Sequence, residues 1–384
     1  PKEMEVEDIK RVVKSYGDAA RRCLQGGLDG IEILISSHLP GTFLSPLVNR
    51  RTDQYGGSLE NRMRFTIEVL EQIREEVGQE FIVGIRNTFD EMKEGGLTFQ
   101  ECIKMANHLS AAGLVDFLNV NRGNSETVVR MLEAIPLMGT PSSPHLQFVG
   151  SVKAEVDLPV FHAAKIADTA TARYAIKEGL VDMVGMTRAH MADPYLVRKL
   201  EQGKEDVIRP CVGAGYCMDH TAEMLCIHNP ATGREQTMPH LIKKAKDKPR
   251  KIVVVGGGPA GLEAARVCAE RGHRVVLFEG NRALGGQVQM ACRIERRKDL
   301  IGIIDWLDQQ ITKLGVDVHL NCYVGVDEVL SENPNVVIIA AGGIPQPIPL
   351  NEGAEWVVSS WDILTGQVAP CPKVLIYDDH GQHQ

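Results

Sequence analysis

The segment 251–280 constrains the fold more than any other part of the chain. It reads KIVVVGGGPAGLEAARVCAERGHRVVLFEG, which is an apolar run, a glycine-rich turn, a helical pattern and a second apolar run. The glycines with G-x-G-x-x-G spacing are Gly256, Gly258 and Gly261. Such a turn lets backbone amides approach a pyrophosphate at a helix N-terminus. Glu279 ends the second run, where a carboxylate can bind a ribose hydroxyl. The segment therefore predicts a Rossmann-like nucleotide-binding domain, which we place at residues 249–384.

Before this segment the chain alternates short apolar runs with amphipathic helical patterns. We expect strands at 30–35, 81–86, 116–121, 158–164 and 182–187, helices at 9–25, 59–77, 99–112 and 167–179, and a long loop at 36–58. Short strands separated by helices of about 10 to 15 residues indicate βαβ units and a parallel sheet. Five such strands without a glycine-rich turn favour the C-terminal part of a (β/α)8 TIM barrel over residues 1–208. In that fold the chemistry lies at the carboxyl ends of the strands.

The composition excludes several classes of protein. The chain has 384 residues, 43% of them hydrophobic, and a net charge of −8, which argues against a nucleic-acid-binding surface. No apolar run approaches the roughly 18 residues of a membrane-spanning helix. We expect a cytoplasmic protein with reduced thiols. The chain begins within a helical pattern and ends soon after an apolar run at 373–377, which we expect to be a strand, so we expect further sequence on both sides.

Three of the nine cysteines gather in one segment between the two predicted domains, at 209–248. They are Cys211, Cys217 and Cys226. In a reducing compartment, clustered cysteines favour a metal site or catalysis over disulfides. A thiol-rich segment between two domains suggests an electron relay.

Two further segments resemble a known family. Residues 43–65, FLSPLVNRRTDQYGGSLENRMRF, and residues 184–194, VGMTRAHMADP, resemble the old yellow enzyme family of FMN-dependent oxidoreductases. The resemblance implies FMN in the barrel, three barrel strands before Pro1, and Arg86 against the flavin. The ends of the last two strands would bind the FMN phosphate through Ala164, Lys165, Thr187 and Arg188, where the family usually has Gly-Arg pairs.

The candidate catalytic residues depart from the family pattern. Reductases of the family place a carbonyl-binding His directly after a Val-Glu-Ile strand, but here Glu32-Ile33 is followed by Leu34. His38 is the ionisable group that follows, and it either lines the active site or packs under the loop. Arg122 either binds a substrate carboxylate or is a solvated loop residue. Asn124 stands where amine-oxidising relatives have an acidic residue nearby, and it cannot supply that charge.

The cysteine segment resembles the iron–sulfur motif of a subfamily that includes trimethylamine, dimethylamine and histamine dehydrogenases and 2,4-dienoyl-CoA reductase. Its spacing is that of the amine dehydrogenases, but Ala214 replaces one of the four thiolates. Three interpretations remain open: a cluster with three thiolates and a fourth ligand such as Asp219, His220 or water; a three-iron cluster; or zinc or no metal at all. Further nucleotide contacts are implied at Gly286, Gln287, Ala341 and Gly342. The nucleotide would be FAD or ADP.

These observations support one main hypothesis and two alternatives. The main hypothesis is FMN-dependent oxidative N-demethylation of a methylated amine or amino acid, with electrons passed on through the iron–sulfur-type cysteine segment to an electron-transfer flavoprotein or another acceptor. The first alternative is an NAD(P)H-dependent enoate or dienoyl-CoA reductase. The second is a non-catalytic segment that serves assembly or electron docking. We expect a homo-oligomer without nucleic-acid or membrane partners.

Overall fold

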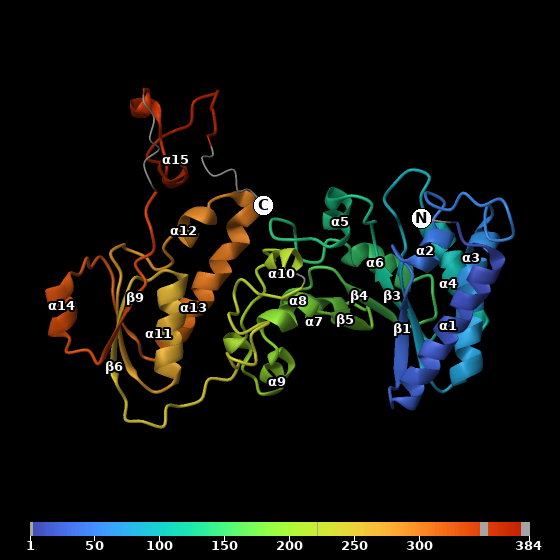
Figure 1. The fold of residues 1–384 in the computed structure, drawn as a ribbon, viewed down its shortest axis with the longest axis horizontal. Helices are drawn as coiled ribbons and strands as arrows, with labels where there is room; N and C mark the ends of the chain where they lie inside the picture. The colour runs from blue at the N-terminus through green and yellow to red at the C-terminus, as the bar shows by residue number, and fades with distance from the viewer. Residues whose placement is uncertain (1–2, 221, 346–351, 378–384) are drawn as a thin grey trace. The chain divides into compact units, whose positions relative to one another are not determined.

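The computed structural model describes residues 3–220, 222–345 and 352–377 of the chain (Figure 1). It contains two compact units, Pro1–Ala189 and His190–Gln384. This division assigns residues 190–208, which we expected in the first domain, to the second unit. The predicted limits of the three domains stay a prediction.

The first unit is built on a five-stranded parallel sheet with sequential strand order. The strands are β1 (Gly30–Leu34), β2 (Ile82–Thr88), β3 (Phe117–Asn121), β4 (Val160–Ala163) and β5 (Met183–Gly185). The helices are α1 (Val6–Gln25), α2 (Leu39–Leu44), α3 (Leu59–Val77), α4 (Phe99–Ala111), α5 (Val128–Ala134), α6 (Leu146–Lys153), α7 (Thr169–Lys177) and α8 (Thr187–Ala192). A sequential order of parallel strands is that of a (β/α)8 barrel. A doubly wound sheet would instead reverse its order near the middle.

The helices of this unit begin at polar capping residues that the sequence supplies. The Ser58 hydroxyl accepts a hydrogen bond from the Asn61 backbone N–H at 3.3 Å, and it begins α3. Thr98 and Glu101 form a reciprocal capping box at the start of α4. These caps satisfy N–H groups that have no partner within the helix, so local sequence determines where both helices start.

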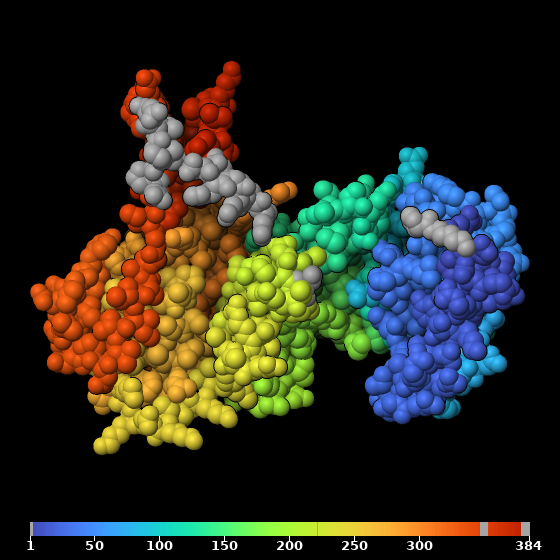
Figure 2. All heavy atoms as spheres, in the orientation of Figure 1, coloured from blue at the N-terminus to red at the C-terminus, as the bar shows by residue number. Residues whose placement is uncertain are grey.

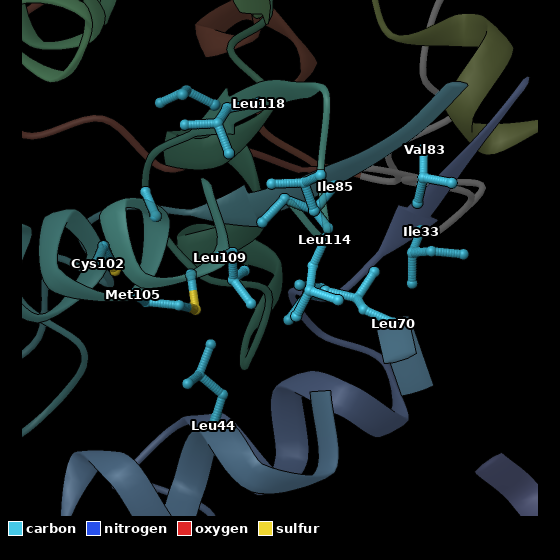
Figure 3. Close-up of a cluster of buried hydrophobic side chains, with 14 of the residues drawn as sticks. Ile33, Leu44, Leu70, Val83, Ile85, Cys102, Met105, Leu109, Leu114 and Leu118 are labelled. Carbon is cyan, nitrogen blue, oxygen red and sulfur yellow. The ribbon is translucent and has the colours of Figure 1, made fainter. Parts of the chain in front are cut away.

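One face of the first sheet packs against helices to form the core (Figure 3). The side chains of Ile33, Val83 and Leu118 leave consecutive strands on this face and are almost completely buried. They meet apolar side chains of the helices, among them Leu70 of α3 and Leu109 of α4. The helices α1 and α3 pack against each other, and both belong to the N-terminal part of the chain that is blue in Figure 2. The opposite face of the sheet carries the polar residues described below.

Side-chain hydrogen bonds from the segment 43–65 hold the connection between β1 and α3 in place. Arg62, whose side chain is 6% exposed, donates to the Leu44 carbonyl at 2.6 Å and pairs with Glu101 at 2.6 Å. Asn49 bridges the carbonyls of Phe43 and Tyr55. These bonds hold the connection after β1 in place, although our expectation that 36–58 is only a loop was wrong. It contains α2, which begins after His38 with Pro at one of its first two positions.

The second unit contains a four-stranded parallel sheet in the order β8-β7-β6-β9. Its strands are β6 (Lys251–Val255), β7 (Arg274–Phe278), β8 (Asp317–His319) and β9 (Val336–Ile339). Its main helices are α11 (Pro259–Glu270) and α13 (Ile301–Lys313), with shorter ones at α9 (Leu196–Glu201), α10 (Tyr216–Asp219), α12 (Val288–Ala291), α14 (Val326–Ser331) and α15 (Ser360–Thr365). The strand order reverses at β6, so the crevice of a doubly wound fold opens beyond the carboxyl ends of β6 and β9.

Two further expectations need correction. We did not predict α5 and α6, which lie between β3 and β4. Residues 373–377 form no strand, because no neighbouring strand in the described segments pairs with them. Among the described helices, none combines the length and the apolar character needed to cross a bilayer.

Candidate functional site

The polar face of the first sheet carries one row of residues across three strands. Leu34, Arg86 and Asn119 are register partners on β1, β2 and β3. Register partners in a parallel sheet project from the same face. In the preceding row, Glu32 pairs with Gly84, which has no side chain. The Asn119 amide donates to the Glu32 carboxylate at 2.8 Å. We call this set the Arg86 face.

Two aromatic rings border the Arg86 face, those of Phe117 on β3 and Phe161 on β4. Phe117 lies beside Gly84, where an added Cβ would come within 2.1 Å of the ring. The rings of Phe117 and Phe161 stack with their centroids 4.6 Å apart. Gly84 is therefore required by a close approach, and the rings give the face an apolar patch beside its charged residues.

The Arg86 face has polar atoms that suit a flavin ring. Arg86 Nε and Asn119 Oδ1 are buried and have no hydrogen-bond partner among the described residues. A guanidinium donates hydrogen bonds, and an amide both donates and accepts them. A flavin ring presents both carbonyl acceptors and an imide donor. The residues present thus fit FMN, and a contact of Arg86 with the flavin stays a prediction.

The predicted FMN-phosphate residues lie at the ends of β4 and β5. They are Ala164, Lys165, Thr187 and Arg188. Lys165 adopts φ +55°, and its ammonium donates to the Thr140 carbonyl. Arg188 Nη2 donates to the Pro136 carbonyl at 2.9 Å, whereas its Nη1 is buried without a partner in the described structure. Both cations therefore lie at carboxyl ends of strands, as expected. Their contact with a phosphate stays a prediction.

His38 lies in the connection after β1, next to the loop that follows β3. Its side chain is exposed, and Nδ1 lies 3.1 Å from the Ser36 carbonyl. Ser37, with φ +60°, accepts a hydrogen bond from the Ser125 hydroxyl at 2.7 Å. The structure therefore brings two predicted site segments together. A catalytic role of His38 stays a prediction.

Arg122 and Asn124 are engaged within their own surroundings. The Arg122 guanidinium pairs with the Asp90 carboxylate at 3.0 Å and lies 4.4 Å from the centre of the Phe148 ring. Asn124 donates to the Glu91 carbonyl at 2.8 Å. These contacts tie the loop after β3 to the loop after β2. Binding of a substrate carboxylate by Arg122, or a catalytic role of Asn124, stays a prediction.

The glycine-rich turn after β6 has the geometry that its sequence predicts. Gly256 adopts φ +108°, and a Cβ there would meet the Ala340 carbonyl oxygen at 2.2 Å. A Cβ on Gly261 would lie 1.9 Å from the Gly256 oxygen, so the first turn of α11 packs directly on the glycine turn. A Cβ on Gly258 would meet nothing within 4 Å. Gly258 is thus the glycine that leaves room for a ligand.

Glu279 ends β7 beside this turn. Its carboxylate is buried and accepts hydrogen bonds from the backbone N–H groups of Gly257 and Asn281, each at 2.7 Å. The side chain is therefore fixed at the end of the strand. Binding of a ribose hydroxyl there stays a prediction.

The remaining predicted nucleotide contacts converge on the same turn. Gly285 N–H donates to the Gly257 carbonyl at 2.8 Å, and a Cβ on Gly286 would lie 3.2 Å from Gly258 Cα. The Gln287 amide donates to the Gly343 carbonyl at 3.2 Å. This bond joins the loop before α12 to the segment after β9, which holds Ala341 and Gly342. Three segments that are far apart in sequence thus surround one site.

The cysteine segment packs onto the nucleotide-binding domain. Val212 is buried in the core of the second unit, and Ala214 packs against that core. Cys211, Cys217 and Cys226 form no disulfide. Across the residues that the structure describes, no three His, Cys, Asp or Glu side chains are grouped to hold a metal ion. The structure therefore shows no ligand set, and the three cysteines as metal ligands stay a prediction.

Sequence reasoning missed the buried residues that anchor this segment. Arg209 and His228 flank the cysteines, and Trp306 lies on α13. The Arg209 guanidinium lies 4.3 Å from the centre of the Trp306 ring. Burial and the Arg209 guanidinium lower the pKa of His228 to about 4, so the imidazole is neutral. In the sequence, Arg209 lies close to a cysteine, but Trp306 lies on a helix far along the chain. The sequence alone therefore does not show that these two residues meet.

A barrel-type sheet with a flavin-compatible face, together with a doubly wound nucleotide domain, defines a flavin-dependent oxidoreductase. Residues 1–207 match the NADH:flavin oxidoreductase / NADH oxidase family, and residues 251–298 match the FAD dependent oxidoreductase family. The chain belongs to the NADH:flavin oxidoreductase / NADH oxidase family. The predictions of an FMN-binding barrel and of an FAD-type domain are confirmed.

Several known proteins are similar over the whole chain. A probable N-methylproline demethylase of Rhizobium meliloti (strain 1021) is 51% identical over 100% of this chain and 57% of its own length. A multifunctional alkene reductase/demethylase of Caballeronia cordobensis is 50% identical over 100% of this chain and 56% of its own length. The solved structure of a 2-naphthoyl-CoA reductase has a TM-score of 0.87 and 34% identity, covering 96% of this chain and 56% of its own. The chain thus spans a little over half the length of these relatives.

Proposed function

We propose that this protein catalyses the FMN-dependent oxidative N-demethylation of a methylated amine or amino acid. The observation that carries the proposal is Leu34 at the end of β1, in the same row as Arg86. An alkene reductase needs a donor where charge develops on the substrate carbonyl, and such a donor contributes about 3 to 4 kcal/mol. An isobutyl side chain cannot donate, but it can pack against an N-methyl group. The names of the two relatives that are half identical to this chain support the same reaction.

The residues of the Arg86 face would hold the reactants in place. Arg86 and Asn119 have buried polar atoms that can bind a flavin edge, and Leu34 would border the substrate. When bound, FMN supplies the acceptor for a hydride from the N-methyl carbon. The iminium left on the substrate is hydrolysed by water, which gives formaldehyde and the demethylated amine. An apolar border favours the neutral amine, whose lone pair is free to form the iminium.

Electrons would then leave the barrel. We propose an electron-transfer flavoprotein as the acceptor, with the cysteine segment and the nucleotide-binding domain on the route. A homo-oligomeric state and a cytoplasmic location belong to the same proposal.

A second candidate function is NAD(P)H-dependent reduction of an enone or enoyl-CoA. It is favoured by the names of two similar proteins, one an alkene reductase/demethylase and the other a 2-naphthoyl-CoA reductase. Both reactions use the same flavin in opposite directions, so one barrel can host either. The donor at the substrate carbonyl distinguishes them, and Leu34 does not supply it.

Anaerobic mixing separates the two functions. The full-length protein is mixed with N-methylproline, dimethylglycine or sarcosine, with proline and glycine as unmethylated controls. The proposal predicts flavin bleaching by methylated substrates only, accompanied by formaldehyde. Bleaching by NADH or NADPH, without formaldehyde from any methylated substrate, would support the reductase instead.

A further inference from the structure

The cysteine segment is fastened to the nucleotide-binding domain by one buried cluster, which consists of Arg209, His228, Glu263, Arg266 and Trp306. We call it the Arg209 cluster. Arg209 is 7% exposed and lies two residues before Cys211. Its Nη1 donates to the His228 carbonyl, and its Nη2 donates to Glu263 at 3.1 Å. One planar guanidinium thus binds two different segments while it stacks on the Trp306 ring.

His228, which follows Cys226 in the cysteine segment, makes the reciprocal contact to the stretch before Cys211. Its Nδ1 lies 2.9 Å from the Pro210 carbonyl and must be the donor, because a carbonyl only accepts. Its ring meets Trp306 edge to face, with centroids 5.3 Å apart and planes at 87°. The backbone before Cys211 and the backbone after Cys226 are therefore linked in both directions. Neither segment can move without breaking a buried hydrogen bond.

The other side of the cluster lies on the helix that follows the glycine turn. Glu263 is in the second turn of α11 and pairs with Arg266 at 2.7 Å as well as with Arg209. Burial opposes ionisation of Glu263, but the two guanidinium groups hold its pKa below its usual value. The carboxylate is thus charged, and the arginine of the cysteine segment is ion-paired to the pyrophosphate-binding helix.

We propose that Arg209 is the positioning residue of the cysteine segment, holding its two thiol-bearing stretches at a fixed place against α11. The fork geometry of the guanidinium makes this role possible. A lysine at 209 keeps the charge but cannot bind the His228 carbonyl and Glu263 while stacking on Trp306. Breaking one side of a buried pair leaves the other partner uncompensated, so the structure cannot simply relax around the loss.

Hydrogen–deuterium exchange of the full-length protein tests the first part of the proposal. In R209K and in Trp306→Leu, peptides that cover 211–228 should exchange at least tenfold faster than in the wild type. Trp306→Phe keeps an aromatic surface and should restore most of the protection. R198K is the matched control, because Arg198 lies over the Tyr195 ring at 5.1 Å on an exposed surface of the same unit. It should leave exchange in 211–228 unchanged.

The rate at which the reduced flavins are reoxidised tests the positioning role itself. This test rests on the proposed electron route through the cysteine segment. The flavins are photoreduced without substrate and then mixed with a ferricenium acceptor. R209K should slow reoxidation at least tenfold, Trp306→Phe less than Trp306→Leu, and R198K not at all. Because no amine is used, this result does not depend on the demethylation itself.

Two results would overturn the proposal. One is exchange within twofold of the wild type in both R209K and Trp306→Leu. The other is an equal rise in the exchange rates of peptides from β6 and β7. Such a rise would mean that the whole unit is destabilised and that nothing specific holds the cysteine segment. If R209K does not fold, the comparison of Trp306→Leu with Trp306→Phe decides alone, since absence of any difference between them contradicts the proposal.

Discussion

Changing Gly261 or Gly258 of the glycine-rich turn to alanine should have different effects, because the first change lowers stability and the second lowers mainly the affinity for ADP. In Gly261→Ala the new Cβ would lie 1.9 Å from the Gly256 oxygen, whereas such atoms stay at least 3.0 Å apart. The turn and α11 must therefore separate by about 1 Å. Overpacking of this kind costs roughly 2 kcal/mol. In a unit of this size that lowers the Tm by about 4 to 8 °C. ADP binding should weaken as well, because the turn is displaced.

Gly258→Ala should weaken the binding of ADP while it leaves stability almost unchanged. Gly258 has φ −74° and ψ 177°, which alanine adopts readily, and its Cβ would meet nothing within 4 Å. The stability cost is at most about 1 kcal/mol, the difference between glycine and alanine at an N-cap. The methyl group nevertheless occupies the approach of a pyrophosphate, so the Kd for ADP should rise at least tenfold, or about 1.4 kcal/mol.

Differential scanning calorimetry and isothermal titration with ADP measure both quantities on the full-length protein after removal of bound nucleotide. The reasoning is refuted if Gly258→Ala binds ADP as tightly as the wild type. It is also refuted if Gly261→Ala keeps the wild-type Tm, because the close contact with the Gly256 oxygen would then carry no cost.

Two other predictions follow. Leu34→His places a donor on the Arg86 face, so the ratio of enone reduction to formaldehyde release should rise at least tenfold in steady-state assays; an unchanged ratio would show that position 34 does not select the reaction. Burial lowers the pKa of His162 to about 4, so the unfolded chain takes up a proton first as the pH falls from 6.5. Stability should therefore fall between pH 6.5 and 4 by up to roughly 3 kcal/mol, and His162→Gln should remove that part of the loss in urea titrations; equal pH profiles would contradict it.

Local signals in the sequence predicted much of the fold. The five strands of the first sheet and the Rossmann unit were expected because apolar runs, caps and glycine turns are encoded within a few neighbouring residues. The helix α3 even begins and ends where expected, at Leu59 and Val77. In contrast, α2 forms inside a segment that reads as a loop, where Arg62 and Asn49 fix it through bonds to distant backbone.

The site was only partly predictable for the same reason. The residues of the glycine turn, Gly286 and Gln287 converge as expected, since the motif itself requires that geometry. The engagement of Arg122 by Asp90, and the whole Arg209 cluster, depend on segments that meet only in the folded chain. The strand expected at 373–377 does not form among the described residues, because an apolar run becomes a strand only when it has a partner.

The stoichiometry of a single anaerobic turnover tests the central claim most directly. Full-length protein is mixed with an excess of N-methylproline, and FMN bleaching and formaldehyde are measured in the same sample, with proline as the control. The account predicts one formaldehyde for each FMN reduced and no bleaching with proline. Reduction of the FMN by NADH, reoxidation by an enone and no formaldehyde from any methylated amine would contradict it.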